Sequence, residues 1–100
     1  MPAYYIALRH AMKDEDQMRI YRAKTPATLE GREFKTLAQY GRVRVTSGGD
    51  PGIAAIMEFP SFEAAEDWYD SPGYQDAVRH LYAAADMQCF ILEGGAEDKG

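Results

Sequence analysis

The chain has 100 residues, of which 16 are acidic and 11 are basic, so its net charge is −5. A chain of this length forms one domain, and its acidity argues against binding nucleic acid through bulk charge. No apolar run approaches the ~20 residues of a membrane span, and the N-terminus lacks a signal-peptide pattern. We therefore expect a cytoplasmic protein without nucleic-acid or membrane partners. The lone Cys89 excludes an intrachain disulfide, and we expect a buried, inert thiol rather than a nucleophile.

The N-terminal third predicts a strand followed by a helix. Residues 3–10 alternate between a face with Tyr4, Ile6, Leu8 and His10 and a face with Tyr5, Ala7 and Arg9. Asp14 then opens a helical segment whose acidic residues come first and whose basic residues come later, as the helix dipole favours. Pro26 is expected to kink or interrupt this helix.

The middle third predicts a β-meander. Alternation over Phe34–Tyr40, and again over Arg42–Thr46, indicates a bent strand or a hairpin between Glu33 and Ser47. The turn residues of 47–52 then lead into an apolar strand, Ile53–Phe59.

The last third predicts one broken helix and a closing strand. Pro60 cannot donate to a sheet, and Ser61 can cap a helix that begins at Phe62. Ser71-Pro72 repeats this pattern and predicts a break and a new helix start. Residues 87–93 read as a strand, and 95–100 as a disordered tail after a single domain over 1–94.

This order of elements predicts an α+β, ferredoxin-like split βαβ fold, an antiparallel sheet with two helices on one face. The strands over 53–59 and 87–93 are apolar on both faces, yet two helices cover only one face. We therefore expect a homodimer in which two sheets stack on each other, forming a dimeric α+β barrel. Charge is also uneven, with +4 over residues 1–49 and −9 over 50–100, and the halves could complement each other within the fold or across an interface.

Two stretches carry a resemblance to a known family, the E-F-P-S motif from Glu58 and the W-Y-x-S-P-x-Y motif from Trp68. With the opening Ala3-Tyr4-Tyr5-Ile6 and the ending over 90–94, the pattern resembles a domain-of-unknown-function family of the dimeric α+β barrel superfamily. The resemblance covers nearly the whole chain and implies this fold and a homodimer. Relatives in the superfamily include cofactor-independent monooxygenases and lactone isomerases, so it also implies that an enzyme is one option.

Few residues suggest chemistry. The sequence contains no recognised cofactor or metal motif, so we predict no cofactor and no metal site. His10, at the end of the first strand, is the candidate catalytic residue because an imidazole can transfer protons at neutral pH. A hydrogen-bonded structural histidine is the alternative. His80 lies on the polar side of its helix and is expected on the solvated surface.

Aromatic residues suggest a pocket. Tyr21, Trp68 and Tyr74 are expected to line a cavity between the sheet and its helices and to bind a small organic molecule, the alternative being that they only fill the core. Arg44 is added as a contact for an anionic ligand, against the alternative of a solvated strand face or an ion pair. Two functions remain open: a cofactor-independent enzyme acting on this molecule, or a non-catalytic binding or accessory homodimer.

Overall fold

In a computed structural model that describes residues 1–95, the chain forms four strands and three helices. The predicted tail at 95–100 lies outside the described residues except for Gly95. In chain order the elements are β1 (Ala3–Met12), α1 (Glu15–Leu29), β2 (Lys35–Gln39), β3 (Ile53–Phe59), α2 (Phe62–Tyr69), α3 (Pro72–Ala84) and β4 (Ala85–Glu93). The strands form one antiparallel sheet in the order β2-β3-β1-β4. This is the predicted α+β, ferredoxin-like arrangement.

The helices begin where the capping residues predict. The Asp14 side chain accepts the N–H groups of Asp16 and Gln17 at 3.0 and 3.2 Å and opens α1. Ser61 caps α2, and Ser71 caps α3 with Pro72 as its first residue. These side chains satisfy backbone donors that have no partner within the helix. The broken helix after β3 is thereby confirmed.

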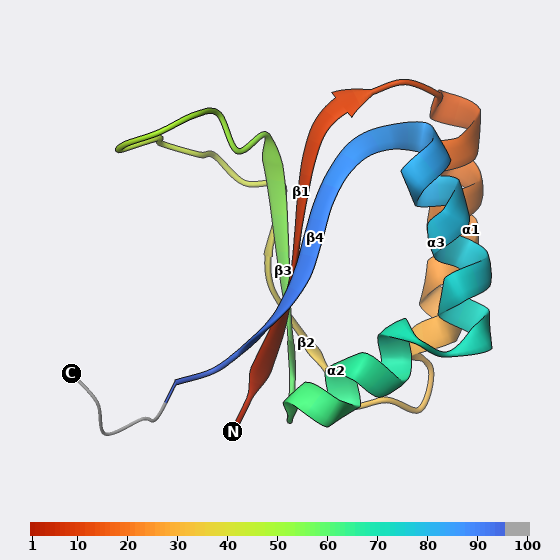
Figure 1. The fold of residues 1–100 in the computed structure, drawn as a ribbon. Coiled ribbons are helices and arrows are strands. Elements are labelled where there is room, and N and C mark those ends of the chain that lie inside the picture. The colour runs from red at the N-terminus through yellow and green to blue at the C-terminus, as the bar shows by residue number, and fades with distance from the viewer. Residues whose placement is uncertain (96–100) are drawn as a thin grey trace.

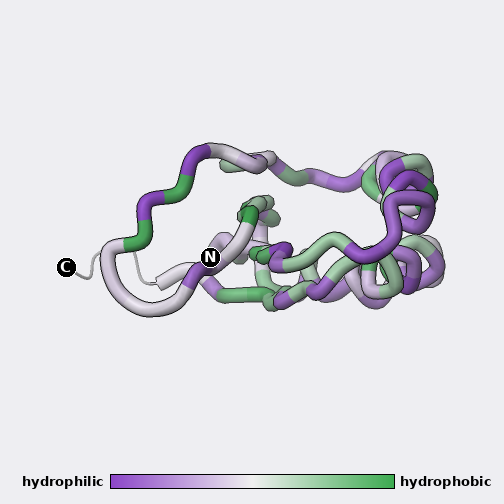
Figure 2. Tube along the Cα trace, turned by 90° about the horizontal axis from the view of Figure 1, so that it is seen from above, coloured by the Kyte–Doolittle hydropathy of each residue, from purple (hydrophilic) through white to green (hydrophobic). Residues whose placement is uncertain are grey.

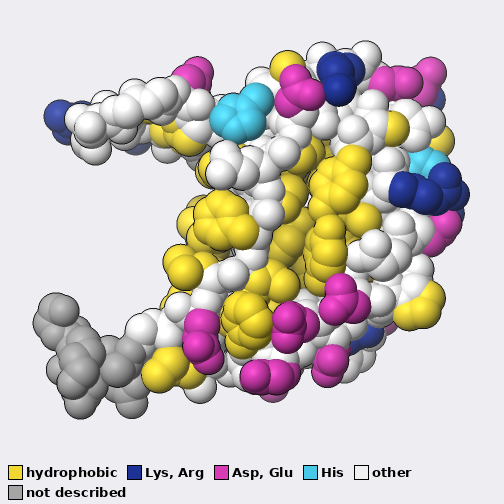
Figure 3. All heavy atoms as spheres, in the orientation of Figure 1, with side chains coloured by type: hydrophobic (Ala, Val, Ile, Leu, Met, Phe, Trp, Pro, Cys, Tyr) yellow, Lys and Arg dark blue, Asp and Glu magenta, His cyan; other side chains and the backbone are white. Residues whose placement is uncertain are grey.

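All three helices lie on one face of the sheet, as Figure 1 shows. The helix-facing side carries Ala3, Tyr5, Ala7 and Arg9 of β1, and cross-strand partners share its side. The opposite side, the open face, carries Tyr4, Ile6, Leu8, Ala38, Ala54, Ile56, Phe90 and Leu92. Phe90 and Leu92 are 40% and 52% exposed. In Figure 3 hydrophobic side chains border the hollow on the side away from the helices.

The prediction of a bent strand or a hairpin between Glu33 and Ser47 is confirmed only in its first part, the strand β2. Its second part is wrong, because β2 ends at Gln39 and no strand follows it before β3. Tyr40 adopts a positive φ of 60°, a conformation that turns the chain out of the sheet. Residues 40–52, the arm, then extend on the side opposite the helices, where Figure 2 shows alternating hydrophilic and hydrophobic residues. The alternation over 42–45 is real, but the described chain offers this segment no neighbouring strand, and a strand needs one for its backbone hydrogen bonds.

The arm returns to the sheet at Gly52, beside β1. Gly52 has a φ of +78°, and a Cβ there would lie 2.1 Å from the backbone oxygen of Arg9. Only glycine fits both the conformation and this approach. The chain also bends at residues 47–49, where Gly48 has a positive φ, so the predicted turn over 47–52 is confirmed. Gly52 fixes the start of β3 against Arg9.

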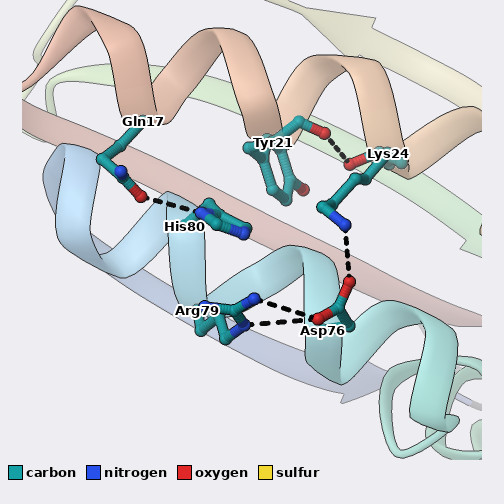
Figure 4. Close-up of polar contacts among 7 residues, drawn as sticks. Gln17, Tyr21, Lys24, Asp76, Arg79 and His80 are labelled. Atoms are coloured by element: carbon teal, nitrogen blue, oxygen red, sulfur yellow. Dashed lines mark hydrogen bonds and ion pairs between the residues drawn. The ribbon is translucent and has the colours of Figure 1, made fainter.

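His80 is buried, which makes its predicted place on the solvated surface wrong. Its Nδ1 lies 2.7 Å from Oε1 of Gln17 on α1, and Figure 4 shows this pair together with the Lys24–Asp76–Arg79 cluster that also joins α1 to α3. α1 packs against the polar side of α3, while the sheet covers the apolar side. Helical periodicity shows only which side of α3 is polar, so it wrongly predicted that His80 on this side is exposed.

α1 continues through Pro26 to Leu29, so this proline does not interrupt the helix. No helix among residues 1–95 is long and apolar enough to cross a membrane.

Candidate functional site

An aromatic cluster fills one end of the helix-facing side. Trp68, Tyr74 and Phe59 are its largest fully buried side chains. The Trp68 ring stacks on Phe59, with centroids 5.3 Å apart, and its Nε1–H donates to Oγ1 of Thr28 at 3.0 Å. The Tyr5 ring packs edge-on against Trp68 at 5.2 Å. Large rings from β1, β3, α2 and α3 therefore leave little space here.

A cavity of about 530 Å³ lies beside this cluster, between α1 and the helix-facing side of the sheet. Its walls are mostly apolar, which is typical of small-molecule sites of this size. The sheet side is formed by Tyr5, Ala7, Arg9, Thr36, Gln39, Ile53, Ala55, Met57 and Met87. The α1 side is formed by Met18, Tyr21, Arg22, Thr25, Pro26, Leu29 and Glu30, and the remaining walls by Phe34, Tyr40, Trp68 and Leu81.

Two alanines make the floor of this cavity. Ala7 of β1 and Ala55 of β3 are direct cross-strand partners and both line the cavity. α1 packs along α3, and side chains this short leave the space below α1 unfilled. The cavity therefore results from two causes: the side chains on this part of the sheet are small, and α1 packs on α3 and stands away from the sheet.

Three tyrosine hydroxyls gather at the boundary between cluster and cavity. Tyr21 and Tyr74 share a hydrogen bond of 2.7 Å between their hydroxyls. Tyr5, which lines the cavity and is 5% exposed, has a buried hydroxyl that makes no hydrogen bond with any described residue. A buried polar atom without a partner is destabilising. The Tyr5 oxygen has almost no accessible surface, so it lies behind the cavity wall, close to Tyr74 and Cys89, and not on the cavity surface.

Burial keeps these hydroxyls protonated. Burial, and then the neighbouring Tyr74 and Cys89 side chains, raises the pKa of Tyr5 well above its ordinary value. Burial, and then Tyr21, likewise raises the pKa of Tyr74, and burial raises that of Tyr21. At neutral pH the three groups can donate hydrogen bonds but do not act as bases. Burial also raises the pKa of the half-buried Cys89 thiol, which disfavours its nucleophilic thiolate.

The structure brings some of the predicted site residues together. Tyr21 and Trp68 line the cavity, and Tyr74 is fully buried behind them and bonded to Tyr21. Arg44 lies in the exposed arm, and His10 lies exposed on β1, directly after Arg9, the last residue of β1 that pairs with β3. Neither lines the cavity.

Four cavity residues were not predicted from the sequence: Tyr5, Ala7, Arg9 and Ala55. Their one signal is alternation, which places each on the same side of the sheet as the core residues Ala3 and Phe59. Among residues 1–95, no group of three or more His, Cys, Asp or Glu side chains could hold a metal ion.

Comparison with known proteins gives a family and a fold. The profile of a domain of unknown function, DUF1330, matches residues 2–95. No curated protein matches the chain.

Three solved structures illustrate the fold similarity. A protein of unknown function from Rhodopseudomonas palustris has a TM-score of 0.70 and 20% identity, over 95% of this chain and 83% of that one. A dimeric ferredoxin-like protein of unknown function from Thermobifida fusca has a TM-score of 0.59 and 13% identity, over 94% and 92%. SnoaB, a cofactor-independent oxygenase from Streptomyces nogalater, has a TM-score of 0.58 and 9% identity, over 99% and 98%. At these identities the likeness concerns the fold alone.

Proposed function

The chain belongs to the DUF1330 family, and we propose that it is a homodimer that binds a small organic molecule in the cavity below α1. The observation that carries the ligand is the mostly apolar cavity of about 530 Å³, with the Tyr5 side chain in its wall and the hydroxyl of this side chain buried without a partner among the described residues. Once the Tyr5 ring turned toward the cavity, a ligand oxygen or nitrogen would accept or donate the missing hydrogen bond, while the apolar walls would bury the rest of the molecule.

The open face supports the homodimer. Its eight apolar residues span all four strands, and a face of this kind is rarely left to solvent in a monomer. A second copy stacked on it would bury the same residues on both subunits, as a two-fold interface requires. Solved neighbours described as dimeric ferredoxin-like proteins support the same assembly. We also place the protein in the cytoplasm, where a single unpaired cysteine is usual, and cell fractionation tests this.

The second candidate function is catalysis without a cofactor. Its supporting observation is the pair of protonated hydroxyls of Tyr21, which lines the cavity, and Tyr5, which lies just behind its surface, because donors held beside a cavity can stabilise negative charge that develops on a substrate oxygen. The fold that the chain shares with the oxygenase SnoaB agrees with this candidate. His10, the group proposed from the sequence, would take part only if the dimer brought it to the substrate, since it does not line the cavity of its own subunit.

The first experiment is native mass spectrometry of the purified protein, followed by a fragment screen observed by NMR. We expect a dimer, and fragments that shift the signals of Tyr5, Ala7 and Ala55. A monomer would contradict the stacked sheets, and the absence of any fragment at these residues would contradict the ligand site.

The matched variants Tyr5→Phe and Tyr21→Phe test the role of the Tyr5 hydroxyl. Tyr5→Phe removes a hydroxyl without a partner, so the unliganded protein should keep or gain stability while the affinity of a fragment at this site falls. Tyr21→Phe removes a hydroxyl that bonds to Tyr74, so it should lose about 1 kcal/mol of stability. A Tyr5→Phe protein that is destabilised and binds normally would contradict the proposal. For the catalytic candidate, once a substrate is known, turnover should fall in Tyr5→Phe and persist in His10→Ala.

A further inference from the structure

The charges along the cavity are arranged unevenly. Arg9 of β1 and Arg22 of α1 line it from facing walls, and Glu30 lines it near the end of α1. Arg9, Arg22 and Glu30 form no ion pair with any described residue. Four ion pairs form elsewhere among residues 1–95. Arg9 is half-buried, whereas Arg22 is exposed at the cavity rim. A cation taken partly out of water without a counterion is costly, so an anion here would be favoured.

The two arginines lie at a similar height in the cavity. β1 and α1 run in opposite directions from the short connection at residues 13–14. At 3.3 Å per strand residue, Arg9 lies about 10 Å from Met12, the end of β1. At 1.5 Å per helical residue, Arg22 lies about 10 Å from Glu15, the start of α1. One anionic group between the walls can therefore face both guanidinium groups.

The far end of the cavity suits an uncharged polar group. Tyr5 stands four residues before Arg9 on the same side of β1, about 13 Å away along the strand. Glu30 lies about 12 Å beyond Arg22 along α1, toward that same end. The Glu30 carboxylate would repel a second anion there, while the Tyr5 hydroxyl needs a hydrogen-bond partner. Ala7 and Ala55 leave room for an apolar body between the two ends.

We propose that the cavity binds an organic monocarboxylic acid, with its carboxylate between Arg9 and Arg22, its apolar body over Ala7 and Ala55, and a neutral hydroxyl or carbonyl oxygen at Tyr5. This inference rests on the proposed function and adds the ligand class to it. Guanidinium groups suit a carboxylate because their paired N–H donors match its two oxygens. The acid can be aromatic or aliphatic, since both classes can supply a carboxylate, an apolar body and a neutral oxygen.

The test compares an acid with its uncharged amide, which has nearly the same shape. The probes are para-hydroxyphenylbutyrate, its primary amide and omega-hydroxyoctanoate, with binding to the purified dimer measured by calorimetry. We expect at least one of the two acids to bind. If the ligand class is aromatic, the aromatic acid should bind about tenfold or more tighter than its amide, because a charge-assisted hydrogen bond contributes that factor or more to the affinity. Binding of omega-hydroxyoctanoate alone would support the aliphatic class.

Matched arginine variants locate the anion. Arg9→Gln and Arg22→Gln should each weaken binding of the acid about tenfold and leave binding of the amide unchanged. Arg19→Gln is the control, because Arg19 is on the same helix but bonds to Asp16 and does not line the cavity.

Three results would overturn the inference. The acid and amide could bind equally, Arg9→Gln and Arg22→Gln could bind the acid as the native protein does, or neither acid could bind. In each case the fragment screen at Tyr5, Ala7 and Ala55 still decides the proposed function, because that screen does not depend on charge.

Discussion

The two ends of the helix-facing side of the sheet are filled in opposite ways. At one end, four aromatic rings pack against one another and are almost completely buried, those of Tyr5, Phe59, Trp68 and Tyr74. At the other end, Ala7 and Ala55 face α1 across an open cavity. One sheet surface thus supports a rigid core and a binding site side by side. Side-chain size on a few strand positions separates them.

The largest effect is expected in the packed end. Trp68→Ala removes a fully buried ring and its hydrogen bond to Thr28, so the free energy of unfolding should fall by about 3–5 kcal/mol in urea denaturation. Trp68→Phe keeps much of the packing and serves as the milder control. A loss under about 1 kcal/mol in Trp68→Ala would mean that this end is also loosely packed.

Alkaline pH should weaken the boundary between the two ends. Because burial raises the pKa of Tyr5 and of Tyr74, the folded chain keeps protons that the unfolded chain releases above pH ~10. Stability is therefore complete below that pH and should fall above it, by about 1.4 kcal/mol per pH unit for each tyrosine that ionises only on unfolding. Denaturation at several alkaline pH values measures this slope. Tyr5→Phe should make it shallower, and an unchanged slope would argue that Tyr5 is accessible to solvent.

A pair of alanines on one strand compares the ends directly. Ala3→Leu adds volume where the side chain is fully buried and should cost about 1–3 kcal/mol. Ala7→Leu adds the same volume at the cavity floor, so its cost should be smaller, but it should abolish fragment binding. Thermal unfolding and NMR binding measure both. Equal destabilisation by the two substitutions would contradict the cavity.

The smallest effect is expected on the polar surface that joins α1 to α3. Lys24 and Arg79 lower the pKa of the exposed Asp76 carboxyl through hydrogen bonds and charge. The stabilisation of the fold by the ionised Asp76 carboxylate is therefore present at neutral pH and is lost as the pH falls through the lowered pKa. Asp76→Asn should destabilise only slightly, because exposed ion pairs are screened by solvent. A loss as large as that of Trp68→Ala would mean that these helices depend on this cluster to hold the cavity open.

Capping and alternation were the strongest signals in the sequence. Ser61, Ser71 and Pro72 predicted two helix starts, and alternation assigned the residues of β1 from Tyr4 to Arg9, and the apolar residues of β3, to their correct sides. Both signals act between residues close in sequence, so they are readable without the tertiary fold. Val43 and Val45 show the limit, because their alternation is genuine while their strand partner is absent from the described chain.

The candidate site was less accessible to sequence reasoning. Tyr21, Trp68 and Tyr74 were selected as aromatic residues and do gather at one place. The cavity itself depends on Ala7 and Ala55, whose small size has meaning only opposite a helix that stands away from the sheet. His80 illustrates the same point, since its burial comes from a neighbouring helix that periodicity does not reveal.

The sequence by itself determined the fold class, the three helix starts, the two sides of β1 and β3 and the family, because helix capping and side-chain alternation depend on residues close together in the chain. Only the tertiary structure decided where α1 stands over the sheet, and hence the cavity, the buried Tyr5 hydroxyl and the facing pair Arg9 and Arg22. The physical reason is that empty space and unpaired groups are properties of how distant segments pack, and no single segment encodes them.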